Sequence, residues 1–209
     1  MRFYLSGNHL AVDFANTVVS PDGAGDTLRR YEDLIAFLVA AGGATRQEAR
    51  RLRAMAEADP RGAAGALAAA RGLREALRAI FGARAEGRAL APEWIEVVNG
   101  ALAVGEGREA LVPSGRGFRR RVVPRREGPE SALVGIARAA AEVIEAGERA
   151  RVRRCGHPAC VLYFLDTSRT GRRRWCSMAV CGNRMKAAAF ARRARAGGRK
   201  RPAARPATS

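Results

Sequence analysis

Four cysteines are the residues of this sequence whose type and spacing could do chemistry. Cys155, Cys160, Cys176 and Cys181 follow the pattern C-x4-C-x15-C-x4-C, so two equal pairs are separated by one loop. Tetrahedral Zn²⁺ needs four ligands that converge on one point, and two cysteine pairs on two turns provide that geometry. Because four cysteines leave no open coordination position, the pattern predicts one structural zinc ion rather than a catalytic one.

Other uses of these cysteines stay open at this point. Disulfides, an iron–sulfur cluster and free thiols in a core are the alternatives to zinc. A reducing cytoplasm disfavours disulfides, and the symmetric pairing with a short loop disfavours an iron–sulfur cluster. His157 lies between the first two cysteines and could replace one of them as a ligand.

The residues around the two pairs predict a treble-clef-like zinc finger. Gly156 and Pro158 suit a tight knuckle between the first two cysteines. Two β-prone runs flank residues 167–171, which predicts a hairpin between the pairs. Cys181 falls near the start of an expected helix over residues 178–195, where backbone dipoles favour the thiolate.

The expected helix over residues 178–195 sorts its side chains by face. Phe190 lies nearly opposite Cys181, so we expect Phe190 to pack on the N-terminal part of the chain. The face assigned to the metal core carries Met178, Cys181, Met185 and Ala188.

Positive charge is concentrated in the same part of the chain. Residues 151–209 hold 14 Arg and 2 Lys against the single acid Asp166, whereas residues 1–150 hold 22 Arg against 19 acids. A one-signed excess of this kind is typical of a nucleic-acid-binding segment, although a solvated charged face is the alternative. The forked donors of arginine match phosphate groups. The predicted nucleic-acid contacts are Arg172, Arg173, Arg174, Asn183, Arg184, Lys186, Arg193 and Arg195.

No stretch of the sequence predicts a membrane span or a secretory leader. The longest uncharged run, residues 34–45, has 12 residues, and a spanning helix needs about 18. The first apolar stretch is interrupted by Asp13 and has no basic leader. We therefore expect no membrane contact and a cytoplasmic location.

The elements that must position these residues are mainly helices. We expect helices from Asp26 to Gly42-Gly43, over residues 45–59 and 61–84, from Pro92, and over residues 129–147. The alternating stretch HLAVDFANTV predicts a short strand, or a strand leading into a helix. A hairpin is expected around residues 114–117.

Taken together, these elements predict a mainly α protein with short β-hairpins, which is an α+β fold. A helical N-terminal domain over residues 1–150 precedes the four-cysteine finger over residues 151–196. A basic tail over residues 197–209 has no apolar face and is expected to be disordered.

The cysteine-rich stretch resembles a known family. CGHPACVLYFLDTSRTGRRRWCSMAVCGNRMKAAAFARR is similar to the CGNR zinc finger, named for the motif at residues 181–184. HLAVDFANTV resembles the signature that opens the ABATE domain, which precedes this finger in the family. The resemblance implies that the four cysteines bind zinc, and it implies a predicted role as stress-induced bacterial transcription regulators.

The polar residues of the N-terminal signature have two interpretations. His9, Asp13 and Asn16 could line a pocket that senses a small-molecule effector. Alternatively, Asp13 and Asn16 could cap the turn that leaves a strand, which is the commoner use of such residues.

Three classes of function remain for comparison. The leading hypothesis is a zinc-dependent DNA-binding transcription regulator whose N-terminal domain senses an effector or a partner. The alternative is an RNA- or ribosome-associated zinc-binding module, which the few aromatic residues of the finger disfavour. An enzyme is not expected, because His9 and His157 are the only histidines and no nucleophile lies beside a base. The sequence does not decide the oligomeric state.

Overall fold

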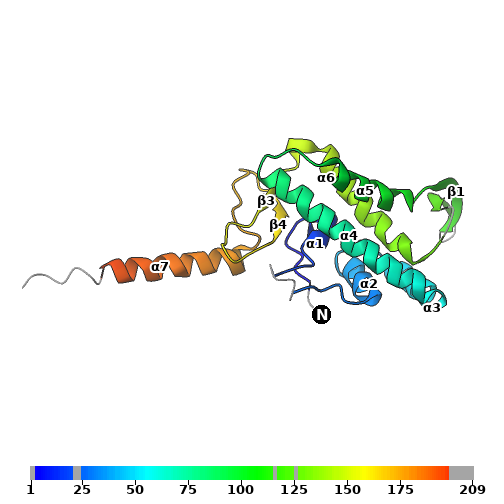
Figure 1. Cartoon of the computed structure of the whole chain (residues 1–209), viewed down its shortest axis with the longest axis horizontal. Coiled ribbons are helices and arrows are strands. Elements are labelled where there is room, and N and C mark those ends of the chain that lie inside the picture. The colour runs from blue at the N-terminus through cyan, green and yellow to red at the C-terminus, as the bar shows by residue number, and fades with distance from the viewer. Residues whose placement is uncertain (1–2, 21–24, 115–116, 125–126, 198–209) are drawn as a thin grey trace, which may run out of the picture.

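The computed structural model describes residues 3–20, 25–114, 117–124 and 127–197. The predicted fold class is confirmed, since helices dominate and the two sheets have two strands each. The long helix α4 runs through the middle of the N-terminal part, with other helices on its sides (Figure 1). The helices of this part are α1 (Leu10–Ala15), α2 (Tyr31–Ala40), α3 (Arg46–Ala58), α4 (Pro60–Ala85), α5 (Pro92–Ala103), η1 (Pro129–Leu133), α6 (Val134–Glu145) and η2 (Gly147–Arg149).

Local signals set the helix boundaries around α3. Thr45 and Glu48 form a capping box, in which each side chain accepts a hydrogen bond from the other residue's backbone amide. Gly42 adopts a φ of 72°, a left-handed conformation that ends α2 at little cost for glycine. Pro60 is the first residue of α4, where its missing N–H is not needed.

The core of the N-terminal part lies where α1, α2 and α5 pack against α4, with α6 packed on α1 and α5. Phe14, Phe37 and Phe81 are fully buried there. Leu73, Leu77, Ile80 and Phe81 form the buried stripe of α4, and Leu67 is only partly buried. Among the described residues, no helix is long and apolar enough to cross a membrane.

The stretch HLAVDFANTV forms the helix α1, so the expectation of a strand was wrong. All five residues from Ala11 to Ala15 are buried. A helix that is buried on every side has no polar face, and its sequence therefore lacks the helical period that would identify it.

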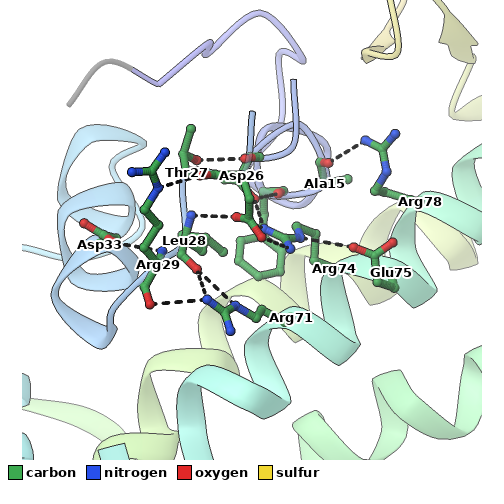
Figure 2. A network of polar contacts seen from close by, with 12 residues as sticks. Ala15, Asp26, Thr27, Leu28, Arg29, Asp33, Arg71, Arg74, Glu75 and Arg78 are labelled. Carbon is green, nitrogen blue, oxygen red and sulfur yellow. Dashed lines mark hydrogen bonds and ion pairs between the residues drawn. The ribbon is translucent and has the colours of Figure 1, made fainter. Parts of the chain in front are cut away.

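The expected start of a helix at Asp26 was also wrong, because α2 begins at Tyr31. Asp26 instead accepts two hydrogen bonds from the buried guanidinium of Arg74, at 2.7 and 2.8 Å (Figure 2). Burial alone would raise the pKa of Asp26, but the hydrogen bonds from Arg74 and Leu28 lower it overall. Arg71 donates to the backbone of Leu28, so α4 fixes the segment that precedes α2.

The hairpin expected around residues 114–117 is present. Strands β1 (Gly107–Ser114) and β2 (Gly117–Pro124) pair antiparallel, with Gly107 opposite Pro124. The turn residues 115–116 lie outside the described part of the chain. The same holds for residues 198–209, so the disorder expected for the tail stays a prediction.

Candidate metal centre and basic surface

The first two cysteines lie in the connection of a short hairpin. Strands β3 (Val152–Arg154) and β4 (Tyr163–Leu165) pair antiparallel, with Val152 opposite Leu165. The amide of Cys155 donates to the carbonyl of Leu162 at 2.9 Å, which extends the pairing into the knuckle. The knuckle therefore brings Cys155 and Cys160 to one end of the hairpin.

The hairpin expected around residues 167–171 was wrong in position. Residues 166–177 form no strand, and their backbone is organised by the carboxylate of Asp166. This carboxylate accepts from the amide and hydroxyl of Ser168 and from the amide of Arg173. Asp166 thus folds the segment back toward the second cysteine pair.

The second pair lies at the start of the C-terminal helix. One π-helical turn, η3 (Met178–Gly182), carries Cys181 and leads into α7 (Asn183–Gly197). The hydroxyl of Ser177 accepts from the amide of Val180 and caps this turn. The expected helix over residues 178–195 is therefore present, but it is regular α-helix only from Asn183.

The four sulfur atoms match a tetrahedral zinc site. All four lie within 4.8 Å of one another, and the sulfur of Cys176 lies 3.8 Å from that of Cys160 and 3.6 Å from that of Cys181. Zinc–sulfur bonds of about 2.3 Å place neighbouring sulfurs about 3.8 Å apart in a tetrahedron. The predicted ligands Cys155, Cys160, Cys176 and Cys181 form the site for one structural Zn²⁺.

His157 is not part of this cluster among the described residues. Its Nδ1 accepts a hydrogen bond from the amide of Ala159 at 3.2 Å and so shapes the knuckle. The amide of Cys176 points at the sulfur of Cys155, 3.4 Å away. Backbone donors of this kind stabilise negative charge on zinc-bound sulfur.

The electrostatics of the four thiols favour a divalent cation between them. A hydrogen bond from Cys176 lowers the pKa of Cys160 to about 5. The same hydrogen bond raises the pKa of Cys176 well above its usual value, and burial raises that of Cys181 to about 11. Four close thiols hold one negative charge easily and resist more, so the thiolate set that zinc requires needs the charge of the metal.

Arg173 and Asp166 stabilise the segment that carries the second cysteine pair. The guanidinium of Arg173 donates to the backbone carbonyls of Ser6, Trp175 and Cys176, and it lies 4.4 Å from the ring centre of Phe164. Burial raises the pKa of Asp166, but hydrogen bonds from Ser168 and Arg173 lower it overall. Sequence reasoning assigned Arg173 to DNA and missed Asp166, although Asp166 is the single acid of the basic segment.

The other predicted nucleic-acid residues are exposed. α7 projects away from the rest of the molecule (Figure 1). Arg174 stacks near the ring of Trp175, with 5.2 Å between the guanidinium carbon and the ring centre. The exposed residues of the predicted set are Arg172, Arg174, Asn183, Arg184, Lys186, Arg193 and Arg195.

Two expectations for the faces of the C-terminal helix were wrong. Phe190 does not pack on the N-terminal part, since its exposed fraction is 75%. Met178 and Ala188 are exposed rather than turned to the metal. The physical reason is that α7 projects away from the rest of the molecule, so no neighbouring element in the described part of the chain covers its side chains (Figure 1).

The N-terminal signature binds the finger directly. The carboxamide of Asn16 donates to the carbonyl of Tyr163 at 2.8 Å and accepts from the amide of the same residue at 2.9 Å. The amide of Leu165 donates to the carbonyl of Gly7 at 2.8 Å. Arg78 of α4 donates to the carbonyl of Ala15 at 3.0 Å and reaches that of Val161. We call these contacts the clamp.

The other two polar residues of the signature also contact neighbouring parts of the chain. Asp13 is buried and accepts from the amide of Gly7 at 2.7 Å, and burial raises its pKa to about 6. His9 lies 3.6 Å from Glu142 of α6. The prediction that His9, Asp13 and Asn16 line an effector pocket is untested, and the contacts of Asp13 and Asn16 hold the chain together.

Comparisons with known proteins match both parts of the chain. A family model named ABATE, described as "Putative stress-induced transcription regulator", matches residues 8–147. A second model, the CGNR zinc finger, matches residues 151–194. Neither description is enzymatic. A search of curated proteins found no match. The chain therefore belongs to the ABATE family and carries a CGNR zinc finger behind its ABATE domain.

Proposed function

We propose that this protein is a zinc-dependent, DNA-binding transcription regulator that responds to stress. The observation that carries the proposal is the sign of the exposed charge on the finger. Asp166 is the single acid in residues 151–209, and its exposed fraction is only 2%. The described surface of the finger therefore presents positive side chains without a negative one, which suits a polyanion.

The helix α7 provides a suitable shape for the duplex. Its 15 residues extend about 22 Å, and the major groove of DNA admits one α-helix. At about 100° per residue, Arg184 and Arg195 lie on one side of α7, and Lys186 and Arg193 lie on the other. Two basic sides could contact the two phosphate strands that border the groove.

The clamp supports a sensing role for the N-terminal domain. Asn16 and Arg78 hold the finger through backbone atoms of Tyr163 and Val161. A change in the N-terminal domain could therefore alter the position of α7 without any flexible linker. We propose that the protein is cytoplasmic, where thiols stay reduced. We also propose that it has no enzymatic activity, because four cysteine ligands leave the zinc ion no open coordination position.

A selection of bound sequences from a random DNA pool tests the proposal. The zinc-loaded full chain should enrich a duplex sequence, and its affinity should fall steeply as salt rises. Removal of zinc with a chelator should abolish binding, because the finger depends on the metal. Equal binding at low and high salt, or undiminished binding without zinc, would contradict the proposal.

The exposed ring of Phe190 favours one alternative function, the binding of single-stranded RNA. Its exposed fraction of 75% would allow a base to stack on it, as in proteins that bind single-stranded RNA. A competition between the selected duplex and single-stranded RNA of the same length decides between the two. Displacement by RNA at lower concentration than by duplex DNA would favour an RNA- or ribosome-associated module.

A further inference from the structure

A cavity lies between the N-terminal segment and the metal centre. Its volume is about 390 Å³, which falls in the range of small-molecule sites. Phe3, Tyr4 and Leu5 line one side, and Val180 and Arg184 belong to the other. The cavity is therefore built by the N-terminal segment and the zinc finger together.

The zinc site does not account for this cavity. Three of its lining residues are the ligands Cys160, Cys176 and Cys181, but the ligand atoms lie within 4.8 Å of one another. An ion bonded to four sulfurs fills the space between them. The apolar walls formed by the N-terminal segment lie outside that tetrahedron and remain free.

Apolar side chains are exposed at this cavity to an unusual extent. Tyr4, Leu5 and Val180 have exposed fractions of 51%, 43% and 41%. They make up half of the large apolar side chains that are exposed in the described part of the chain. Neighbouring exposed apolar groups of this kind mark a binding surface rather than an ordinary exterior.

The polar groups of the cavity favour an anion. No Asp or Glu lines the cavity, and Arg184 supplies an exposed guanidinium. The zinc-bound thiolates of Cys160, Cys176 and Cys181 are negative, so Arg184 is the group of this lining that meets an anion. Ser6 also lines the cavity, and its buried hydroxyl has no hydrogen-bond partner in the described part of the chain. A buried hydroxyl without a partner costs free energy, which a ligand with a polar group could recover.

We propose that this cavity binds a small amphipathic anion, whose apolar body lies against Tyr4, Leu5 and Val180 and whose charged group meets Arg184. The cavity is lined by none of His9, Asp13 and Asn16, so it is a second candidate site beside the pocket predicted at those residues. It gives the effector of the proposed function a place and a chemical class, and in that respect it rests on the proposed function. Binding itself needs no DNA and is measured without it.

Because of the position of Arg184, a ligand in the cavity should affect DNA binding. The same guanidinium is an exposed part of α7, two residues before Lys186. A ligand that engages Arg184 removes one phosphate contact, so it should weaken DNA binding. The coupling is reciprocal, and DNA should weaken ligand binding by the same factor.

Anilinonaphthalene sulfonate is a suitable probe, because it joins an apolar aromatic body to an anionic group. The zinc-loaded full chain should bind it with a saturable rise in fluorescence, and decanoate should displace it. Val180→Trp fills the cavity and should weaken binding about tenfold or more. The matched control is Val97→Trp on α5, since Val97 is also 41% exposed but does not line the cavity.

A second pair of variants tests the charged group. Arg184→Gln should weaken binding of the sulfonate about tenfold, because it removes a charge-assisted hydrogen bond. Arg192→Gln, an exposed arginine on the same helix, should leave it unchanged. Zinc content is measured for each variant. If Val180→Trp loses zinc, Leu5→Trp takes its place as the variant that fills the cavity.

The outcomes separate this inference from the proposed function. Equal probe binding by Val180→Trp, Val97→Trp and the parent chain, with zinc retained, would overturn the cavity as the site. Loss of probe binding in Val180→Trp supports it, even if the protein failed to bind DNA. A protein that binds DNA but never the probe would keep its function and lose this site.

Discussion

At the scale of single residues, Asn16 is the most informative side chain of the clamp. Its carboxamide makes both backbone hydrogen bonds of Tyr163, as a neighbouring strand would. Asn16 is nearly fully buried, so its removal leaves two backbone groups of β4 without partners. We expect Asn16→Ala to lower the free energy of unfolding by about 2–4 kcal/mol, measured by urea denaturation.

Asn99 provides the control for that substitution. It is exposed on α5, and Asn99→Ala should change the free energy of unfolding by no more than about 0.5 kcal/mol. If Asn16→Ala were as mild as this control, the clamp would contribute little to stability.

Asp13 makes stability depend on pH. Burial raises its pKa from 3.8 to about 6 in the folded protein. Below pH 3.8 the group is protonated in both states, and between 3.8 and about 6 stability falls as pH rises. Above pH 6 the loss is constant at up to about 3 kcal/mol. Asp13→Asn keeps an acceptor for Gly7 and removes the titration.

Comparison of urea denaturation for the parent chain and Asp13→Asn at several pH values measures this effect. The advantage of the variant should grow from about pH 4 to about pH 6 and then level off. A difference that does not change with pH would show that Asp13 titrates alike in the folded and unfolded states.

The residues of the site differ in how far sequence predicts them. The four cysteines could be found because their spacing alone satisfies a tetrahedral ion. Asn16 and Asp166 could not be assigned in this way, since Asn16 binds backbone atoms of Tyr163 and Asp166 accepts from backbone amides of Ser168 and Arg173 as well as from the Ser168 hydroxyl. Backbone partners leave no side-chain pattern, and only the fold brings them together. The isolation of Asp166 among basic residues was the single available signal.

At the scale of elements, substitutions on α7 test whether the basic surface binds DNA. Lys186, Arg193 and Arg195 are exposed on it. If they contact phosphates, their replacement by Gln should reduce the salt dependence of DNA binding by about 0.9 for each phosphate that is no longer neutralised. Fluorescence anisotropy at several salt concentrations measures this slope on the selected duplex.

A control with the same change of charge keeps that result specific. Arg46, Arg50 and Arg61 are exposed on α3 and α4, and their replacement by Gln should leave the slope unchanged. Equal slopes for both triple variants would place the DNA-binding surface elsewhere than on α7.

Elements were predictable where local signals act. The capping box at Thr45, the glycine at 42 and the proline at 60 fix the bounds of α3 and its neighbours. α1 was not predictable as a helix, because it is buried on all sides. The finger's hairpin was misplaced because strand pairing with β3 depends on the knuckle that joins the strands, and not on propensity alone.

At the scale of the whole molecule, two separate cores meet at the clamp. The helical core includes Tyr163 of the finger and is partly covered by Trp94. The finger core consists of Cys155, Val161, Leu162, Phe164, Cys176 and Cys181, with Trp175 packed against it. The finger core has few apolar residues, so its stability must depend on the metal, whereas the helical core can stay folded without it.

The two tryptophans report these cores separately after zinc removal. In Trp94→Phe, where Trp175 is the remaining tryptophan, a chelator should shift the emission to longer wavelength as the finger unfolds. In Trp175→Phe, emission from Trp94 should not change. Zinc removal also breaks the hydrogen bonds between Asn16 and Tyr163, so it should lower the melting temperature of the helical core by about 5 °C. An unchanged emission of Trp175 in protein shown to be zinc-free would mean that the finger folds on its apolar contacts alone.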